Sequence, residues 1–310
     1  MGQNWKYQPL TPEQGNLAAM LSTELEMSPV LCSLLVKRGI TSVAEARNFF
    51  RPKLSQLHNP FLMNDMDVAV RRLNKALGKK ERILVYGDYD VDGTTAVALV
   101  YKFLQQFSSN IDYYIPDRNE DGYGISKRGV DYAHSTGVKL IIVLDCGIKA
   151  IEEIAYAKSL GIDFIVCVHH VPDEQLPCAV AILNPKLSGS TYPYPHLSGC
   201  GVGFKFMQAF AMDNGIPADQ LYPLLDLVAV SIASERCIRI GKGQGSGAVS
   251  LLPVIVIQLQ GVAQRIFCCQ HKGGVFHNWV NGRIVGMGHQ QGGTLLGISN
   301  QKLRIAAILT

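Results

Sequence analysis

The sequence predicts an α/β protein: a parallel β-sheet with helices on both faces. Between about residues 82 and 235, short apolar segments rich in β-branched residues alternate with segments of helical periodicity. The apolar segments lack the polar alternation of a sheet that exposes one face to water, so both faces are expected to be covered. With 310 residues, 47% of them apolar and 17% charged, the chain can bury a large core.

The expected elements follow in a regular order. Strands are expected at residues 83–86, 111–115, 140–144, 164–167 and 180–182. Helical periodicity marks residues 95–106, 127–135 and 150–159 between them, and residues 199–214 and 218–234 after them. Alternating strands and helices form parallel sheets through right-handed crossovers.

A helical lead is expected before the first strand. Helices are predicted from residue 13 to 25, from Pro29 to Leu35, over 43–50 and over 66–77, with Gly39 ending the second and Thr41 or Ser42 capping the third. We therefore divide the chain into a helical lead at residues 1–78 and an α/β domain at residues 79–235.

The last 75 residues differ in composition from the rest of the chain. Residues 236–310 contain eight basic residues, 13 glycines and no acidic residue, whereas residues 1–235 contain 21 basic and 25 acidic residues. No fold is assigned to residues 236–310 from their pattern. Our hypothesis is that they form a replaced or out-of-frame end.

The chain carries no recognisable targeting or membrane segment. Residues 1–14 are polar and lack the features of a signal peptide, and the longest apolar run, residues 251–257, is far below the roughly 20 residues that span a bilayer. The eight cysteines have no paired spacing, which favours reduced thiols. We expect a cytoplasmic protein with no membrane partner, and the oligomeric state stays open.

An acidic motif follows the first expected strand. Asp88, Asp90 and Asp92 precede a helix at the carboxyl end of the sheet, where open α/β folds bind ligands. Their mutual repulsion favours a bound cation, and oxygen ligands suit Mg²⁺ or Mn²⁺. A calcium-binding EF-hand loop is disfavoured because its twelfth position falls on Leu99 and a strand precedes it. A solvated acidic turn is the remaining alternative.

Other polar residues follow neighbouring strands. Asp145 ends the third expected strand, and His169 and His170 follow the fourth. Because parallel strands end at a common edge, these residues are expected to converge with the acidic motif. The resulting Asp/His cluster has enough ligands for two metal ions, and its imidazoles favour Mn²⁺ over Mg²⁺.

With these motifs in this order, residues from about 5 to 235 resemble the DHH phosphoesterase superfamily, and within it the RecJ family of single-strand-specific 5′-to-3′ DNA exonucleases. The resemblance implies a two-metal phosphodiester hydrolysis on single-stranded DNA, with roles in DNA repair and recombination. The implied cofactors are two Mn²⁺ or Mg²⁺ ions.

The resemblance also implies roles for individual residues. The expected metal ligands are Asp88, Asp90, Asp92, Asp145, His169 and Glu235, and the catalytic candidates are Asp92 and His170. The expected nucleic-acid contacts are Arg118, Gly122, Tyr123, Gly124, Ser198, Gly199, Gly201 and Gly203. Backbone N–H groups of the glycine-rich segment at residues 198–203 are expected to hold a phosphate, and close helix-to-sheet packing is an equally good explanation of its glycines.

Two positions depart from the family pattern. Val168 stands where the DHH triplet has its Asp, and Glu235 stands where the last metal motif has an Asp. Valine cannot orient an imidazole, and the extra methylene of Glu235 displaces its carboxylate. Two alternatives to a RecJ-type exonuclease therefore stay open: a DHH enzyme for short oligonucleotides or pyrophosphate, and an inactive remnant or binding module.

Overall fold

A computed structural model describes residues 8–117 and 121–241, with side chains described up to Glu235. The chain divides into two compact units; within the described part the first comprises residues 8–57 and 239–241, and the second comprises residues 58–117 and 121–238. The expected replaced end is residues 236–310, and all of it beyond residue 241 lies outside the described residues.

Residues 8–57 of the first unit form three short α-helices and a 3₁₀ turn at Leu54–Gln56. The helices are α1 (Pro12–Leu25), α2 (Pro29–Lys37) and α3 (Val43–Phe50). Thr11 and Ser42 cap α1 and α3 with reciprocal side-chain and backbone hydrogen bonds. Gly39 has a φ of 78°, which lets the chain leave α2 through a left-handed turn. The predicted helices of this region are therefore present.

The second unit contains the predicted parallel sheet. Its strands are β1 (Arg82–Gly87), β2 (Ile111–Tyr114), β3 (Val138–Leu144), β4 (Asp163–Cys167) and β5 (Ala181–Leu183), in the spatial order β2-β1-β3-β4-β5. Every neighbouring pair is parallel. Gly87 pairs with Leu144, and Leu144 pairs with Cys167, so the last residues of β1, β3 and β4 lie side by side.

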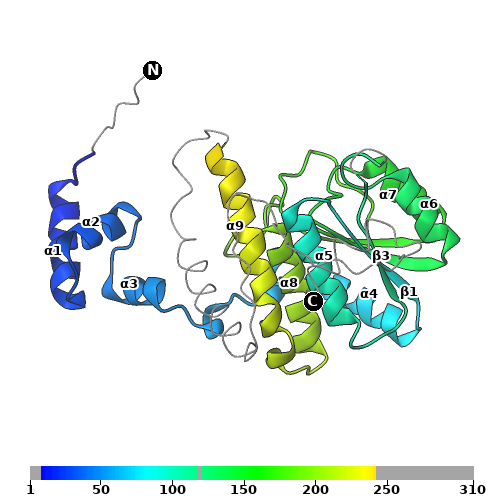
Figure 1. The fold of residues 1–310 in the computed structure, drawn as a ribbon, viewed down its shortest axis with the longest axis horizontal. Helices are drawn as coiled ribbons and strands as arrows, with labels where there is room; N and C mark the ends of the chain where they lie inside the picture. The colour runs from blue at the N-terminus through cyan, green and yellow to red at the C-terminus, as the bar shows by residue number, and fades with distance from the viewer. Residues whose placement is uncertain (1–7, 118–120, 242–310) are drawn as a thin grey trace, which may run out of the picture. The chain divides into compact units, whose positions relative to one another are not determined.

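Helices cover both faces of this sheet, as the sequence predicts (Figure 1). One layer contains α4 (Met66–Gly78), α5 (Val91–Leu104) and α8 (Gly199–Asp213), and the opposite layer contains α6 (Lys127–Ser135) and α7 (Ile151–Ser159). Buried residues of α6 and α7 join strand residues in one apolar cluster. Because α4 contacts β5 and α8, it packs with the sheet, although we expected it in the helical lead.

The region after α8 differs from the sequence-based expectation. The single helix expected at 218–234 is instead two short 3₁₀ turns, Ala218–Gln220 and Tyr222–Leu224, followed by α9 (Leu225–Gly241). Pro217 and Pro223 explain the difference, because proline donates no backbone hydrogen bond and restricts the residue before it. Helix α9 also continues six residues beyond the expected domain boundary at Glu235.

Among the helices within residues 8–117 and 121–241, none combines the length and apolar character needed to cross a membrane.

Candidate metal centre

The acidic motif forms the connection from β1 to α5. Asp90 is the N-cap of α5, and its carboxylate accepts a hydrogen bond from the N–H of Gly93 at 2.9 Å. Asp88 and Asp92 are each only 1% exposed. A Cβ on Gly93 would lie 2.5 Å from the carbonyl oxygen of Asp88, so only glycine lets α5 begin this close to the end of β1. The motif therefore buries two carboxylates at the carboxyl edge of the sheet.

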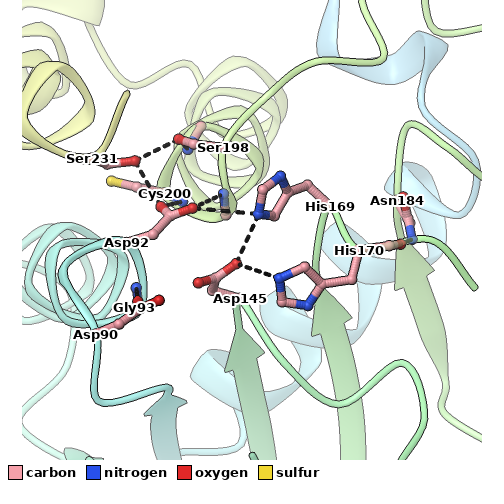
Figure 2. A network of polar contacts seen from close by, with 12 residues as sticks. Asp90, Asp92, Gly93, Asp145, His169, His170, Asn184, Ser198, Cys200 and Ser231 are labelled. Atoms are coloured by element: carbon pink, nitrogen blue, oxygen red, sulfur yellow. Dashed lines mark hydrogen bonds and ion pairs between the residues drawn. The ribbon is translucent and has the colours of Figure 1, made fainter. Parts of the chain in front are cut away.

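Asp145 projects from the adjacent strand end. It follows β3, has a φ of 59° and donates its backbone N–H to the carbonyl oxygen of Cys167 at 2.9 Å. This left-handed conformation is one that Asp and Asn adopt more readily than most residues. The Asp145 Oδ1 atom lies 3.2 Å from Nε2 of His169 and 3.7 Å from Nε2 of His170. The aligned strand ends thus bring all three side chains together (Figure 2).

Three overlapping groups of potential ligands result. Within each group, one donor atom from each residue lies within 4.8 Å of the others. The groups are Asp88 with Asp90 and Asp145, Asp145 with His169 and His170, and Asp92 with His169 and Glu235. Since Asp145 and His169 each occur in two groups, the arrangement suits two neighbouring ions with shared ligands.

The electrostatics of the centre favour a cation. Burial, followed by the charges of Asp92 and Asp90, raises the pKa of Asp145 well above its ordinary value. Its Oδ1 atom is buried and accepts no well-directed hydrogen bond. A divalent ion would supply the missing charge compensation, and a mixed carboxylate and imidazole donor set suits Mn²⁺. The residues present therefore fit the metal ions that the sequence predicts.

Asp92 has a different environment from the other acids. Its Oδ2 accepts a hydrogen bond from the N–H of Gly199 at 2.7 Å, and its Oδ1 accepts from the N–H of Cys200 at 2.8 Å and the hydroxyl of Ser231 at 2.6 Å (Figure 2). The Ser231 hydroxyl lies 2.6 Å from that of Ser198, the N-cap of α8. We call these five residues the Asp92 network; it joins the beginnings of α5 and α8 to α9.

The glycine-rich segment at the start of α8 donates hydrogen bonds to Asp92. Residues Ser198, Gly199, Gly201 and Gly203 are all buried, and the anion at this helix N-terminus is the carboxylate of Asp92. The N–H of Gly201 donates to the Ser198 hydroxyl, and a Cβ on Gly203 would lie 3.1 Å from a methyl carbon of Leu144. These contacts favour the packing explanation of the glycines, and a phosphate contact at this turn stays a prediction.

The segment at residues 122–124 lies beside the centre. Tyr123 is 63% exposed, and partial burial followed by the charges of Asp88 and Asp145 raises the pKa of its hydroxyl. Gly122 and Gly124 have φ values of 78° and 80°. The hydroxyl of Tyr86 donates to the carbonyl of Gly124 at 2.9 Å and so fixes this segment to β1. The remaining expected contact, Arg118, lies outside the described residues.

The two positions that depart from the family pattern differ in their surroundings. Val168 is fully buried in the apolar cluster beneath α6 and α7. Glu235 offers a carboxylate oxygen to the same group as Asp92 and His169. The longer side chain of Glu235 is therefore compatible with a metal-ligand position.

Sequence reasoning missed the contributions of Ser231 and Tyr86. Ser231 precedes Glu235 by four residues on α9, a spacing that places both on one helix face, so helical periodicity could have found it. Tyr86 lies within an apolar strand run, and no local signal distinguishes its hydroxyl from those of other buried tyrosines.

Residues 82–232 match the family model described as the DHH family, N-terminal domain. Two sequence relatives are the single-stranded-DNA-specific exonucleases RecJ of Bacillus subtilis and of Escherichia coli. The first is 38% identical over 231 residues, which are 74% of this chain and 28% of the relative. The second is 38% identical over 220 residues, which are 68% of this chain and 37% of the relative. The chain thus spans about a third of the length of these relatives.

The fold of this chain is also similar to solved structures of RecJ proteins. A RecJ structure from Thermus thermophilus in complex with Mn²⁺ has a TM-score of 0.59 and 25% identity, covering 72% of this chain and 30% of that one. A RecJ exonuclease bound to manganese has a TM-score of 0.54 and 28% identity, and the match covers 65% of this chain and 48% of that one. The predicted resemblance is confirmed.

Proposed function

Since the chain belongs to the DHH family through residues 82–232, we propose that it is a metal-dependent phosphodiesterase that degrades single-stranded DNA from the 5′ end. The observation that carries the proposal is the convergence of Asp88, Asp90 and Asp145 with His169 and His170 at one sheet edge. The similarity to RecJ exonucleases supports DNA as the substrate. The proposal includes a cytoplasmic role in DNA repair and recombination, as the resemblance to RecJ implies.

The residues have separate tasks in this reaction. Asp88, Asp90, Asp145, His169 and Glu235 would hold two Mn²⁺ or Mg²⁺ ions, which supply Lewis-acid charge to offset the negative charge that builds on the phosphate. Asp92 belongs to a ligand group with His169 and Glu235, so its expected metal and catalytic roles stay part of the proposal, and its three hydrogen bonds would hold the carboxylate in position.

His170 is placed to meet the substrate. Its side chain is 37% exposed, and its backbone carbonyl accepts a hydrogen bond from the side-chain amide of Asn184 at 2.9 Å. Figure 2 shows its imidazole beside Asp145, whose Oδ1 lies 3.7 Å from Nε2. We propose that it contacts the scissile phosphate while Asp145 keeps the ring oriented.

The test is hydrolysis of a single-stranded oligonucleotide labelled at either end, in Mn²⁺ and in EDTA. We expect Mn²⁺-dependent release of nucleotides from the 5′ end, and loss of at least a hundredfold in rate for Asp145→Asn. Activity that persists in EDTA, or an Asp145→Asn variant as fast as the parent chain, contradicts the proposal.

The net charge of residues 1–235 favours a second candidate substrate. Residues 1–235 carry more acidic than basic residues, so attraction to a long phosphate backbone is weak. A DHH enzyme for short oligonucleotides has less need of that attraction. Comparing rates on dinucleotides and on 30-nucleotide strands separates the two candidates: faster turnover of dinucleotides supports the short substrate.

The Val168→Asp variant tests for lost activity. If the parent chain is inactive and this variant hydrolyses DNA, the chain is a lapsed exonuclease. If both are inactive and neither takes up Mn²⁺, a binding module is the better interpretation. Because Val168 is fully buried in an apolar cluster, the variant must first be shown to be folded by circular dichroism.

A further inference from the structure

A cavity lies where the strands of the sheet begin, at the edge opposite the metal centre. Its volume is about 740 Å³, within the range of ligand pockets. The segments that enter β1, β2 and β3 form it, and their lining residues include Lys80, Arg82, Ser109, Asn110, Thr136 and Lys139. Strand β3 begins at Val138 and Asp145 follows its end, so about 20 Å of extended chain separates Lys139 from Asp145. The cavity is therefore separate from the candidate metal centre.

Side chains hold the entering segments together. The side-chain amide of Asn110 donates a hydrogen bond to the carbonyl of Lys80 at 3.0 Å, and Arg82 donates to the carbonyl of Thr136 at 3.2 Å. These bonds join residues that are 30 and 54 positions apart. The folded domain itself therefore forms the cavity, without a ligand to assemble it.

The acidic residues of the lining are engaged by arginines. Glu81 lies 2.8 Å from Arg72, and both side chains are largely buried. Asp112 lies 3.5 Å from Arg82 and accepts the backbone N–H of Tyr113 at 2.9 Å. The negative charge of both acids is thus partly compensated before any ligand binds.

Two lysines of the lining have no such partner. Lys80 and Lys139 are exposed, and within residues 8–117 and 121–241 neither forms an ion pair. None of the described residues that line the cavity is aromatic. The lining therefore offers two ammonium groups and the hydrogen-bonding side chains of Ser109 and Asn110 rather than a stacking surface. This combination suits phosphate groups.

Lys80 occupies a costly backbone position. It has a φ of 53° just after α4, which lets the N–H of Glu81 donate to the carbonyl of Ala76 at 2.9 Å and close the helix. Glycine and asparagine adopt this left-handed conformation more readily than lysine does. The helix end therefore gives no reason for a lysine here, whereas an anion site beside it does.

We propose that this cavity is a metal-independent binding site for a compact polyanion with two adjacent phosphate groups, which Lys80 and Lys139 contact. Two ammonium groups on separate segments match two neighbouring phosphates. Inorganic pyrophosphate and the diphosphate of a nucleotide share this chemistry. The site does not depend on the proposed exonuclease function, because it uses none of the residues of the metal centre.

The test is calorimetric titration of the full chain in EDTA with pyrophosphate, orthophosphate or adenosine diphosphate. Without a metal ion, the acidic residues of the metal centre repel phosphates. We expect pyrophosphate to bind at least tenfold more tightly than orthophosphate, and added salt to weaken the binding because exposed charges are screened. The tighter of pyrophosphate and adenosine diphosphate identifies the source of the phosphates. Orthophosphate that binds as tightly as pyrophosphate contradicts the assignment of two phosphates.

Lysine variants locate the binding. Lys80→Asn and Lys139→Met should each weaken pyrophosphate binding about tenfold. Because asparagine tolerates the left-handed position, Lys80→Asn should resist urea at least as well as the parent chain, so its lost binding cannot result from unfolding. Lys149→Met is the matched control: its side chain is 63% exposed at the opposite edge of the sheet, beyond Asp145, and binding should not change.

Three results would overturn the proposal. The first is no binding of pyrophosphate at millimolar concentration. The second is a loss of binding in Lys149→Met that equals or exceeds the loss in Lys139→Met, since the anion then binds at the other edge. The third is a hexaglutamate peptide that binds more tightly than pyrophosphate, which would assign the cavity to an acidic protein segment.

Discussion

Replacing Asp145 by Asn should stabilise the metal-free protein while removing its capacity to bind metal. Asp145 is 1% exposed, and its pKa is raised by burial and by the charges of neighbouring acids. Asn has nearly the same shape, and it tolerates the left-handed backbone of this position. The substitution therefore removes a charge without altering the packing.

The magnitude follows from the neighbouring charges. Carboxylate oxygens of Asp88 and Asp90 lie within 4.8 Å of that of Asp145. Each such pair repels by about 1 kcal/mol in water and by about 3.5 kcal/mol at an effective dielectric constant of 20. Protonation limits the penalty, because keeping an ordinary carboxyl neutral at pH 7 costs about 4 kcal/mol. We expect Asp145→Asn to raise the free energy of unfolding by about 1–4 kcal/mol.

The assay is urea unfolding in EDTA, followed by circular dichroism between pH 4 and pH 8. A carboxyl whose pKa is raised in the folded state loses stability as the pH rises above its unfolded pKa of about 3.9. The advantage of the Asn variant should therefore be small at pH 4 and grow toward pH 7. Mn²⁺ should raise the unfolding midpoint of the parent chain but not that of the variant.

Asp92→Asn is the matched control for this prediction. Asp92 is as buried as Asp145, but its carboxylate accepts three hydrogen bonds, and an amide group would present N–H donors to backbone N–H groups. This variant should lose about 2–4 kcal/mol of stability. If Asp145→Asn is no more stable than the parent chain in EDTA at pH 7, the repulsion inferred for the centre is absent.

Three further predictions concern other described residues. Gly199→Ala keeps every candidate metal ligand, but its added Cβ would lie 2.4 Å from Oδ1 of Asp145 and displace that carboxylate. We therefore expect calorimetry to show Mn²⁺ binding weakened at least tenfold; unchanged affinity would contradict this close contact. Ser231→Ala should lower the free energy of unfolding by about 1.5–3 kcal/mol in urea, since it removes a hydrogen bond to the buried carboxylate of Asp92; a loss below about 0.5 kcal/mol, on the order of a surface substitution, counts against the Asp92 network. Burial lowers the pKa of Lys205 from 10.5 to about 8, so its ammonium destabilises the fold below pH 8 and this penalty is released as the pH rises. The parent chain should gain about 2 kcal/mol between pH 8 and 9.5 relative to Lys205→Met, and parallel pH profiles would refute this.

Local signals in the sequence were sufficient for most of the fold. The helix at residues 127–135 has the predicted bounds because Ser126 caps it, and the helix at residues 43–50 has them because Ser42 and Glu45 form a capping box. The apolar strands were recognisable because burial on both faces leaves uninterrupted β-branched runs. Where the prediction failed, at residues 218–224, two prolines outweighed the helical periodicity.

The strand pattern alone predicts the candidate site where its residues end adjacent strands, whereas Glu235 on α9 was expected only from the family resemblance. The rule that parallel strands end at one edge correctly brings Asp88, Asp145 and His169 together. The rule also places Asp92 near His169, but it does not reveal that the carboxylate of Asp92 accepts hydrogen bonds from Gly199 and Cys200, which lie 107 and 108 residues further along the chain. The sequence therefore left two explanations open for the glycine-rich turn of α8, and it did not indicate that the carboxylate of Asp92 accepts hydrogen bonds there.

The hydrogen bond between Ser231 and Asp92 joins residues that are 139 positions apart. A ribosome that adds about 5–20 residues per second needs roughly 7–28 s to make the intervening chain. Throughout that interval the carboxylate of Asp92 lacks its Ser231 donor, and its hydrogen bonds to the N–H groups of Gly199 and Cys200 can form only once the chain has reached α8. The Asp92 network is therefore complete only after synthesis has passed Ser231 in α9.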